Sequence, residues 1–181
     1  MLERVTEADG VVLDIVYATD RVFTGHAVYT RPVAMLLPQA RAKLLVAVRL
    51  AATMGLRLKI FDAYRPIEAQ WIFWHAATDK SFVADPRKGG IHTRGAAVDL
   101  TLIDAEGVDL DMGAAFDEFS PRSAHACFEI SAEAQRNRAL LLGIMTAAGW
   151  DNYRLEWWHY QLFDYHRYPP LCASAVPGGP M

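Results

Sequence analysis

Two short stretches of the sequence carry histidines and carboxylates close together. His92 is followed seven positions later by Asp99, and Glu156 and His159 lie three positions apart in a run rich in aromatic residues. Two imidazoles and one carboxylate can supply the three protein ligands of a catalytic zinc ion, which keeps an open position for water. A further carboxylate beside the metal can act as a general base. The combination therefore predicts a catalytic metal site.

The local geometry required of these stretches is specific. Side chains alternate along a straight strand, so residues an odd number of positions apart point to opposite faces. Gly95 offers a bend between His92 and Asp99. Glu156 and His159 require a β-bulge or a strand end. Asp99 lies in an apolar run, where an unpaired carboxylate is costly to bury, so a metal, an arginine or a water-filled cleft must accompany it.

Each of these residues, taken singly, also has a purely structural interpretation, because buried polar groups are usually just hydrogen-bonded. We interpret the four remaining histidines in this way and assign them no role: His26, His75, His125 and His166. The joint pattern favours a site instead. It also includes Arg65, which precedes Pro66 at an expected strand-to-helix junction, where a side chain can point into a cleft.

Composition places the chain among ordinary globular proteins. It has 181 residues, of which 52% are hydrophobic and 22% charged, consistent with a single domain. A net charge of −3 gives no reason to expect nucleic acid as a partner. The sequence has no run long enough for a membrane span and begins with acidic residues, unlike a signal peptide. Cys127 and Cys172 lack metal-knuckle spacing and are expected to be free thiols in a reducing compartment, which predicts a cytoplasmic protein.

Hydrophobic periodicity predicts the elements that must position these residues. Helices are expected from Pro38 to Gly55, from Pro66 to about Ala77, and from Ala132 to Ala148 with Ser131 as the cap. Strands are expected at 11–17, 56–61 and 96–103, with a hairpin return through 108–110, and in the aromatic run 155–160. Residues 112–130 are expected to be irregular.

The order of these elements lacks a regular βαβ alternation. It predicts a single α+β domain with a mainly antiparallel sheet flanked by helices. We expect this domain to cover residues 1–168 and the tail 169–181, rich in Ala, Pro and Gly, to be poorly ordered. The oligomeric state does not follow from these patterns.

Several short motifs together resemble the zinc D,D-peptidases of the peptidase M15 family, and more closely its VanX-type D-alanyl-D-alanine dipeptidases. The resemblance covers about residues 11–165 in order and spacing. It is carried by Tyr17-Ala18-Thr19, Phe23-Thr24-Gly25, Asp62-x-Tyr64-Arg65-Pro66, His92-Thr93-Arg94-Gly95-x-Ala97-x-Asp99, Met112-Gly113, Phe116-Asp117 and Leu155-Glu156-Trp157-Trp158-His159-Tyr160. It implies a Hedgehog/DD-peptidase-like fold and one zinc ion per chain.

The resemblance also implies roles for individual residues. His92, Asp99 and His159 would ligate zinc, Glu156 would act as general base and then acid, and Arg65 would stabilise the oxyanion. Zinc acidifies water, Glu156 can move the proton, and an arginine keeps its charge beside a developing oxyanion.

On the substrate side, the resemblance implies that Asp117 receives the free ammonium group of a small dipeptide. Tyr17, Phe73 and Trp157 would line the pocket. In one respect the sequence departs from the subgroup, which usually carries serines before the first zinc histidine, one of them thought to bind the substrate carboxylate. Gly90 and Ile91 stand there instead, so the carboxylate must be bound by other groups, such as backbone amides of this loop.

The leading hypothesis is zinc-dependent hydrolysis of D-Ala-D-Ala, either to remove cell-wall precursors, as in antibiotic resistance, or to recover wall dipeptides. One alternative is a D,D- or L,D-carboxypeptidase of the same family that acts on longer wall peptides; cleavage of N-acylated substrates distinguishes it. Another is a non-catalytic zinc- or peptide-binding module, which would need neither Glu156 nor Arg65.

Overall fold

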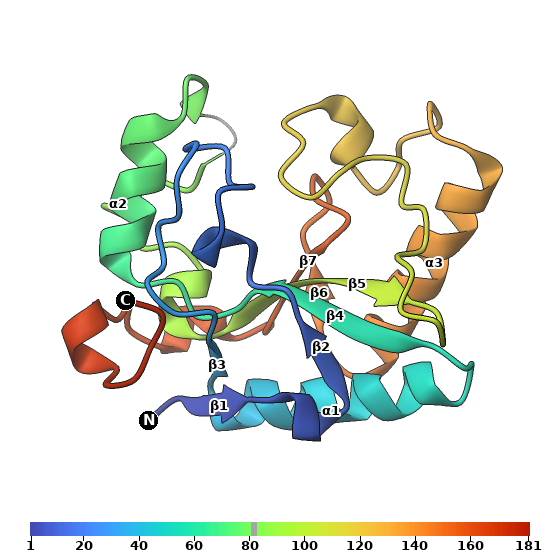
Figure 1. Cartoon of the computed structure of the whole chain (residues 1–181), viewed down its shortest axis with the longest axis horizontal. Coiled ribbons are helices and arrows are strands. Elements are labelled where there is room, and N and C mark those ends of the chain that lie inside the picture. Colours follow the sequence, from blue (N-terminus) through green and yellow to red (C-terminus); the bar gives the residue numbers. More distant parts are fainter. Residues whose placement is uncertain (81–82) are drawn as a thin grey trace.

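A five-stranded sheet with the order β2-β4-β5-β7-β6 forms the centre of the fold (Figure 1). The computed structural model describes residues 1–80 and 83–181. The strands span Val11–Leu13 (β2), Arg57–Asp62 (β4), Ala97–Ile103 (β5), Asp151–Asn152 (β6) and His159–Gln161 (β7). β2 runs parallel to β4, and the other pairings are antiparallel. The structure thus confirms the predicted α+β class with a mainly antiparallel sheet.

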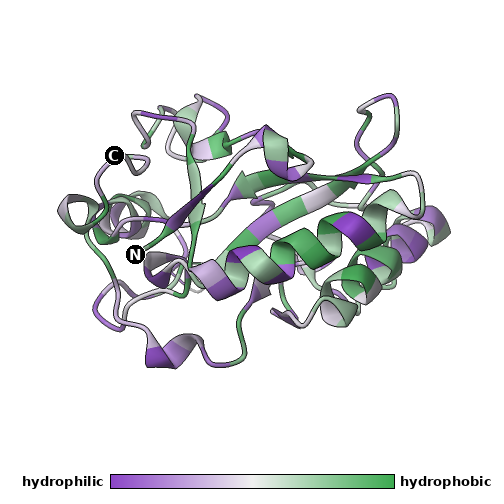
Figure 2. Cartoon of the chain, turned by 90° about the horizontal axis from the view of Figure 1, so that it is seen from below, coloured by the Kyte–Doolittle hydropathy of each residue, from purple (hydrophilic) through white to green (hydrophobic). Residues whose placement is uncertain are grey.

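Three α-helices flank the sheet within the described residues: α1 (Pro38–Ala52), α2 (Ile67–Ala76) and α3 (Ala132–Ala147). α1 packs against β4 and α3, and α3 contacts β5 and β6, so these two helices cover one face, as the view from below shows (Figure 2). The predicted helix starts are confirmed, with Pro38 in the first turn of α1 and the Ser131 side chain accepting a hydrogen bond from the Ala134 amide at 3.0 Å.

Three strand predictions need correction. The strand expected at 11–17 ends at Leu13, and Val16–Ala18 forms a 3₁₀ turn whose carbonyl at Val16 accepts from the Thr19 hydroxyl. The expected return at 108–110 is a single bridge between Ile103 and Asp109. The aromatic strand begins only at His159. Around Val16 and Glu156, local hydrogen bonds in turns replace ladder bonds, and apolar content alone does not reveal these turns. The return at 108–110 is antiparallel as predicted, with the Leu110 amide bonded to the Leu102 carbonyl, but it is too short to form a strand.

A second, two-stranded sheet was not predicted. β1 (Glu3–Val5) pairs antiparallel with β3 (Ala34–Leu36). Just before β1, Leu2 packs against Gly95, where a Cβ atom would lie 2.5 Å from the Leu2 Cδ2 atom. The N-terminal segment therefore rests directly on the bend that precedes β5.

The central strand β5 is buried along its whole length, from Ala97 to Ile103. Its apolar side chains extend a core to which β4 and the helices also contribute. Asp99 and Thr101 are the polar residues within this strand, and both are at least 98% buried. In the pairing with β7, Asp99 lies directly opposite His159. The sheet thereby brings two of the residues singled out above face to face.

The C-terminal segment, for which composition predicted poor order, has defined contacts. The Pro180 carbonyl accepts hydrogen bonds from the amides of Thr30 and Arg31, at 2.9 and 3.1 Å. The Leu171 amide donates to the Thr93 carbonyl at 2.8 Å, and Val176 is buried. Residues 169–181 therefore pack across the segment that carries His92.

In the described parts of the chain, no helix combines the length and apolarity that a membrane crossing requires. Cys127 and Cys172 are both free thiols, as the sequence predicted.

Candidate active site

Two of the three expected metal ligands come from one continuous stretch of chain. His92 begins a 3₁₀ turn, His92–Arg94, that ends at Gly95 with a left-handed φ of 64°. The chain then enters β5, where Asp99 is the third residue. This turn re-aims the chain, so His92 and Asp99 face one site although they are an odd number of positions apart. The predicted role of Gly95 as a bend is confirmed.

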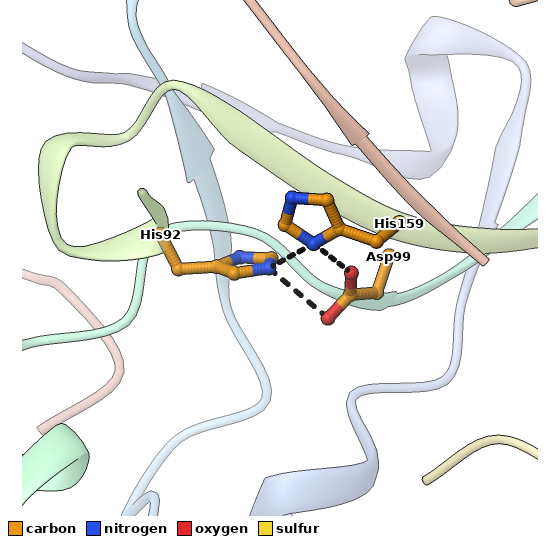
Figure 3. A group of neighbouring side chains, drawn as sticks. All are labelled: His92, Asp99 and His159. Atoms are coloured by element: carbon orange, nitrogen blue, oxygen red, sulfur yellow. Dashed lines mark hydrogen bonds and ion pairs between the residues drawn. The ribbon is translucent and has the colours of Figure 1, made fainter. Parts of the chain in front are cut away.

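The three side chains converge on one point (Figure 3). His92 Nε2 lies 3.2 Å from Asp99 Oδ2 and 3.0 Å from His159 Nδ1, and His159 Nδ1 lies 3.0 Å from Asp99 Oδ1. All three residues are buried, with exposed fractions of 2–6%. Burial alone would raise the pKa of Asp99, but the two adjacent imidazoles hold that pKa well below its usual range, so the carboxylate is ionised.

The outer nitrogens of both imidazoles have partners that fix their protons. His92 Nδ1 lies 2.7 Å from the Ala63 carbonyl oxygen, which can only accept a hydrogen bond, so this nitrogen carries the proton. His159 Nε2 lies 3.1 Å from Gln161 Oε1, also an acceptor. When these imidazoles are neutral, the inner nitrogens, Nε2 of His92 and Nδ1 of His159, carry the lone pairs.

Two nitrogen lone pairs and an ionised carboxylate thus point at one another at hydrogen-bond distance. Such an arrangement is repulsive unless shared protons or a cation sit among the three groups. A tetrahedral zinc site with metal–ligand bonds of 2.0–2.1 Å would separate its ligand atoms by about 3.3 Å, close to the separations found here. The residues present fit a zinc ion in both donor type and spacing.

Glu156 reaches the same site from a turn that precedes β7. Its amide donates to the Tyr153 carbonyl at 3.2 Å, and the His159 amide donates to the Glu156 carbonyl at 3.4 Å, so the chain coils through this segment. The turn brings Glu156 Oε2 within 3.9 Å of His159 Nδ1. Burial raises the pKa of Glu156 to about 7, which suits a group that takes up and releases a proton near neutral pH.

Arg65 follows β4 and is held rigidly at the cavity. Its Nε and Nη2 atoms lie 3.0 and 2.9 Å from Asp62 Oδ2, and its Nη1 donates to Gln70 Oε1 at 3.1 Å. The guanidinium also lies over the rings of Tyr17 and Phe73, 5.0 and 5.1 Å from their centroids. Burial alone would lower the pKa of Arg65, but the acidic groups around it raise the pKa well above the usual value. Arg65 is therefore a fixed positive charge.

Asp117 lies in the irregular region that the sequence predicted at 112–130. It is the one non-glycine residue with positive φ in the described chain, at 58°. Its buried Oδ2 atom has no hydrogen-bond partner there. Burial raises the pKa of this carboxyl to about 7. A carboxylate with one unpaired oxygen at a cavity wall is suited to a cationic ligand.

These groups share one cavity of about 300 Å³, a volume at the lower end for small-molecule sites. His92, Asp99, His159, Glu156, Arg65 and Asp117 all line it, together with Tyr17 and Phe73. Trp157, expected to line the pocket, does not: it is buried with its amide bonded to the Ser123 carbonyl, 3.0 Å away. Trp158 lines the cavity instead, because adjacent side chains point in different directions.

Gly90 and Ile91 also line the cavity, immediately before His92. A Cβ atom at Gly90 would lie 3.5 Å from Gln70 Oε1, an ordinary contact, so space does not require a glycine. The departure from the expected serines therefore removes a hydroxyl group from the cavity wall without closing the space.

Sequence reasoning missed several cavity residues. Gln70, Tyr153 and Gln161 line the cavity. Buried Asp62 does not line it but accepts a hydrogen bond from Arg65 Nε. Gln161 had a signal, because it lies two positions after His159 and so shares its face of a strand. Tyr153 had none beyond its proximity to Glu156.

The chain matches the family model described as D-ala-D-ala dipeptidase, peptidase M15, over residues 4–173. It belongs to the peptidase M15 family. The similar proteins include three that bear the name D-alanyl-D-alanine dipeptidase. That of Escherichia coli K12 is 42% identical over 88% of this chain and 82% of its own length. Those of Enterococcus faecium and Enterococcus faecalis V583 are 36% and 33% identical, each over 86% of this chain and 87% of the relative.

Proposed function

We propose that this chain is a zinc-dependent dipeptidase that hydrolyses D-Ala-D-Ala to two D-alanine molecules. The observation that carries the proposal is the convergence of three potential metal-ligand atoms, from His92, Asp99 and His159, in a cavity that Glu156 and Arg65 also line. Membership of the M15 family and relatives named D-alanyl-D-alanine dipeptidase support the substrate class.

The ligand set would hold one zinc ion per chain, which when bound supplies Lewis-acid chemistry that acidifies a water molecule and polarises a carbonyl group. Glu156 would accept the proton of the attacking water and then deliver it to the leaving amine. Its raised pKa, about 7, supports both halves of this role, because the carboxyl can be charged or neutral near neutral pH.

Arg65 would stabilise the negative charge that develops on the carbonyl oxygen of the scissile peptide bond. Its bonds to Asp62 and Gln70 fix the guanidinium before the substrate arrives, so no reorganisation is needed during the reaction. Arginine also retains its charge beside other cations, whereas a lysine can lose its proton.

Asp117 would bind the free ammonium group of the dipeptide. An unpaired carboxylate oxygen in the cavity wall would gain a partner from such a substrate and would remain unpaired with an N-acylated peptide. Tyr17 and Phe73 would limit the room for side chains. Backbone amides around Gly90 are the candidates for binding the substrate carboxylate in place of the absent serines.

The unpaired Oδ2 atom of Asp117 favours a dipeptidase over a carboxypeptidase for longer peptides, because a longer peptide would bring a neutral amide to this position. Glu156 and Arg65 argue against a non-catalytic binding module, since binding alone requires neither a general base nor an oxyanion partner. The free thiols Cys127 and Cys172 fit a reducing compartment and support a cytoplasmic enzyme.

The test combines metal analysis with a panel of three substrates. We expect about one zinc ion per chain, release of D-alanine from D-Ala-D-Ala, and little cleavage of L-Ala-L-Ala or N-acetyl-D-Ala-D-Ala. Comparable cleavage of the acetylated peptide would instead identify a carboxypeptidase. Zinc binding without cleavage of any of the three would favour a binding module.

A further inference from the structure

The two metal-ligating imidazoles are held in different ways. His92 donates from Nδ1 to the backbone carbonyl of Ala63. This carbonyl would be present whichever residue stood at position 63. His159 depends on a side chain, because its Nε2 faces Gln161 Oε1 at 3.1 Å. Gln161 is 8% exposed and lies on the same face of β7 as His159, two positions further on. The orientation of His159 is thus sensitive to substitution at position 161.

The direction of this hydrogen bond is set one residue further out. A glutamine amide could present either its oxygen or its nitrogen to His159. Gln161 Nε2 lies 3.2 Å from Asp151 Oδ2, and a carboxylate can only accept, so the nitrogen must face Asp151 and the oxygen must face His159. Asp151 lies directly opposite Gln161 in the pairing of β6 with β7. The short edge strand β6 therefore supplies the carboxylate that orients the Gln161 amide.

We propose that Gln161 and Asp151 are positioning residues that hold His159 with its proton on Nε2 and its lone pair on Nδ1, and that they thereby set the affinity of the site for its metal. This inference rests on the proposed zinc-dependent function. The negative charge of Asp151 polarises the Gln161 amide, so the Gln161 oxygen accepts more strongly from His159 Nε2. The stronger hydrogen bond makes Nδ1 of His159 a better electron-pair donor. Without the pair, either nitrogen of His159 can carry the proton, and only one of these forms presents its lone pair to Asp99 and His92.

The first readout is zinc affinity, measured by competition with a chromophoric chelator. Gln161→Leu removes the acceptor, and we expect zinc affinity to fall about 10–100-fold. Asp151→Asn should lower zinc affinity by a smaller factor, because an asparagine oxygen can still accept from the Gln161 amide. Some loss is expected because the asparagine carries no charge. Gln135→Leu is the control for a lost glutamine amide: Gln135 bonds to the Ile130 carbonyl and does not line the cavity, so zinc affinity should change less than twofold.

A conservative exchange separates positioning from packing. The double variant Gln161→Glu with Asp151→Asn keeps the side-chain length, places a carboxylate against His159 Nε2 and avoids two adjacent charges. We expect it to restore zinc affinity to near that of the parent protein. Long-range ¹H–¹⁵N spectra of the chelator-treated protein should show the His159 proton on Nε2 in the parent, and a mixture of the two tautomers in Gln161→Leu.

The outcomes distinguish this inference from the proposed function. If the parent binds zinc and Gln161→Leu binds it equally well, or if His159 keeps its proton on Nε2 in that variant, the positioning role is wrong while the function stands. If the parent itself fails to bind zinc, the proposed function fails. A loss of zinc affinity in Gln161→Leu that the double variant does not restore would indicate packing and would also overturn the positioning role.

Discussion

The two walls of the cavity are built differently. On one side, Asp99 and His159 face each other across β5 and β7, and hydrogen bonds hold the outer nitrogens of both imidazoles. On the other side, Asp117 stands in irregular chain with a positive φ and an unpaired oxygen. The strands fix two of the three groups assigned to the metal, Asp99 and His159, whereas irregular chain carries Asp117, the group assigned to ammonium binding. Substitutions on the sheet side should abolish the reaction, and those on the loop side should change its specificity.

The largest effect on activity is expected at Glu156, which lies in a turn but whose side chain reaches His159 of β7. Glu156→Gln keeps the shape of the side chain and removes the proton acceptor, so kcat should fall about 10²–10⁴-fold while zinc content stays near one per chain. Glu129→Gln, at an exposed position, serves as the control for a lost carboxylate. Retention of more than a tenth of the parent kcat would remove Glu156 from the mechanism.

Arg65 provides the next test of the rigid side. Arg65→Lys retains a positive charge but cannot reproduce the bonds to Asp62 and Gln70, so kcat for D-Ala-D-Ala should fall about 10²–10³-fold with a smaller change in KM. Steady-state kinetics give the two constants separately, and thermal unfolding shows whether the fold is kept. A rise in KM with kcat unchanged would assign Arg65 to ground-state binding instead.

Asp117 tests the loop side. Asp117→Asn should lower kcat/KM for D-Ala-D-Ala about 10–100-fold, because a hydrogen bond to a charged group contributes roughly 1.5–3 kcal/mol. The same substitution should change kcat/KM for N-acetyl-D-Ala-D-Ala much less. The ratio of kcat/KM for the free dipeptide to that for the acetylated one should therefore fall. If the asparagine variant kept the full preference for the free amine, ammonium recognition would lie elsewhere.

The pH dependence of the free enzyme adds a second test of Asp117. Its pKa is raised to about 7, so the carboxylate is lost as the pH falls through that value. Binding of a cationic amine should therefore weaken below pH 7, and kcat/KM should decline with it. Since Glu156 also titrates near pH 7, the informative quantity is the difference between the parent and Asp117→Asn profiles. The Asp117→Asn profile of kcat/KM should keep the titration of Glu156 and lose that of Asp117. Identical profiles for the parent and the variant would contradict the role of Asp117 in ammonium binding.

The smallest effect concerns the bend at Gly95, between the proposed metal ligands His92 and Asp99. Gly95→Ala places a Cβ atom at a φ of 64° and against Leu2, so unfolding free energy should fall by about 1–3 kcal/mol. Gly55→Ala is the matched control, with a φ of 72° but open space around the new atom. Urea denaturation of both variants separates backbone strain from displacement of Leu2; equal losses would mean that Leu2 adapts freely.

Sequence reasoning succeeded where residue type and spacing carry direct physical content. The helices, the central strands and the bend at Gly95 follow from such patterns. The choice of His92, Asp99 and His159 as one set came from their residue types together with the resemblance to the M15 family. It failed where the outcome depends on neighbours distant in sequence. Whether Trp157 or Trp158 faces the cavity is decided by the turn at Glu156, and the order of residues 169–181 comes from partners such as Thr30 and Thr93.

The pairing of Asp99 with His159 has a consequence for how the chain folds. Because these ligands lie on two strands separated by α3 in sequence, the site exists only after β5 and β7 have paired in register. A slip of one residue would turn His159 to the opposite face and take its nitrogen away from Asp99. A metal ion that binds His92, Asp99 and His159 would therefore favour chains with the native register during refolding. In the folded protein, a metal ion bound by these residues would cross-link two central strands, and we expect its removal to speed unfolding.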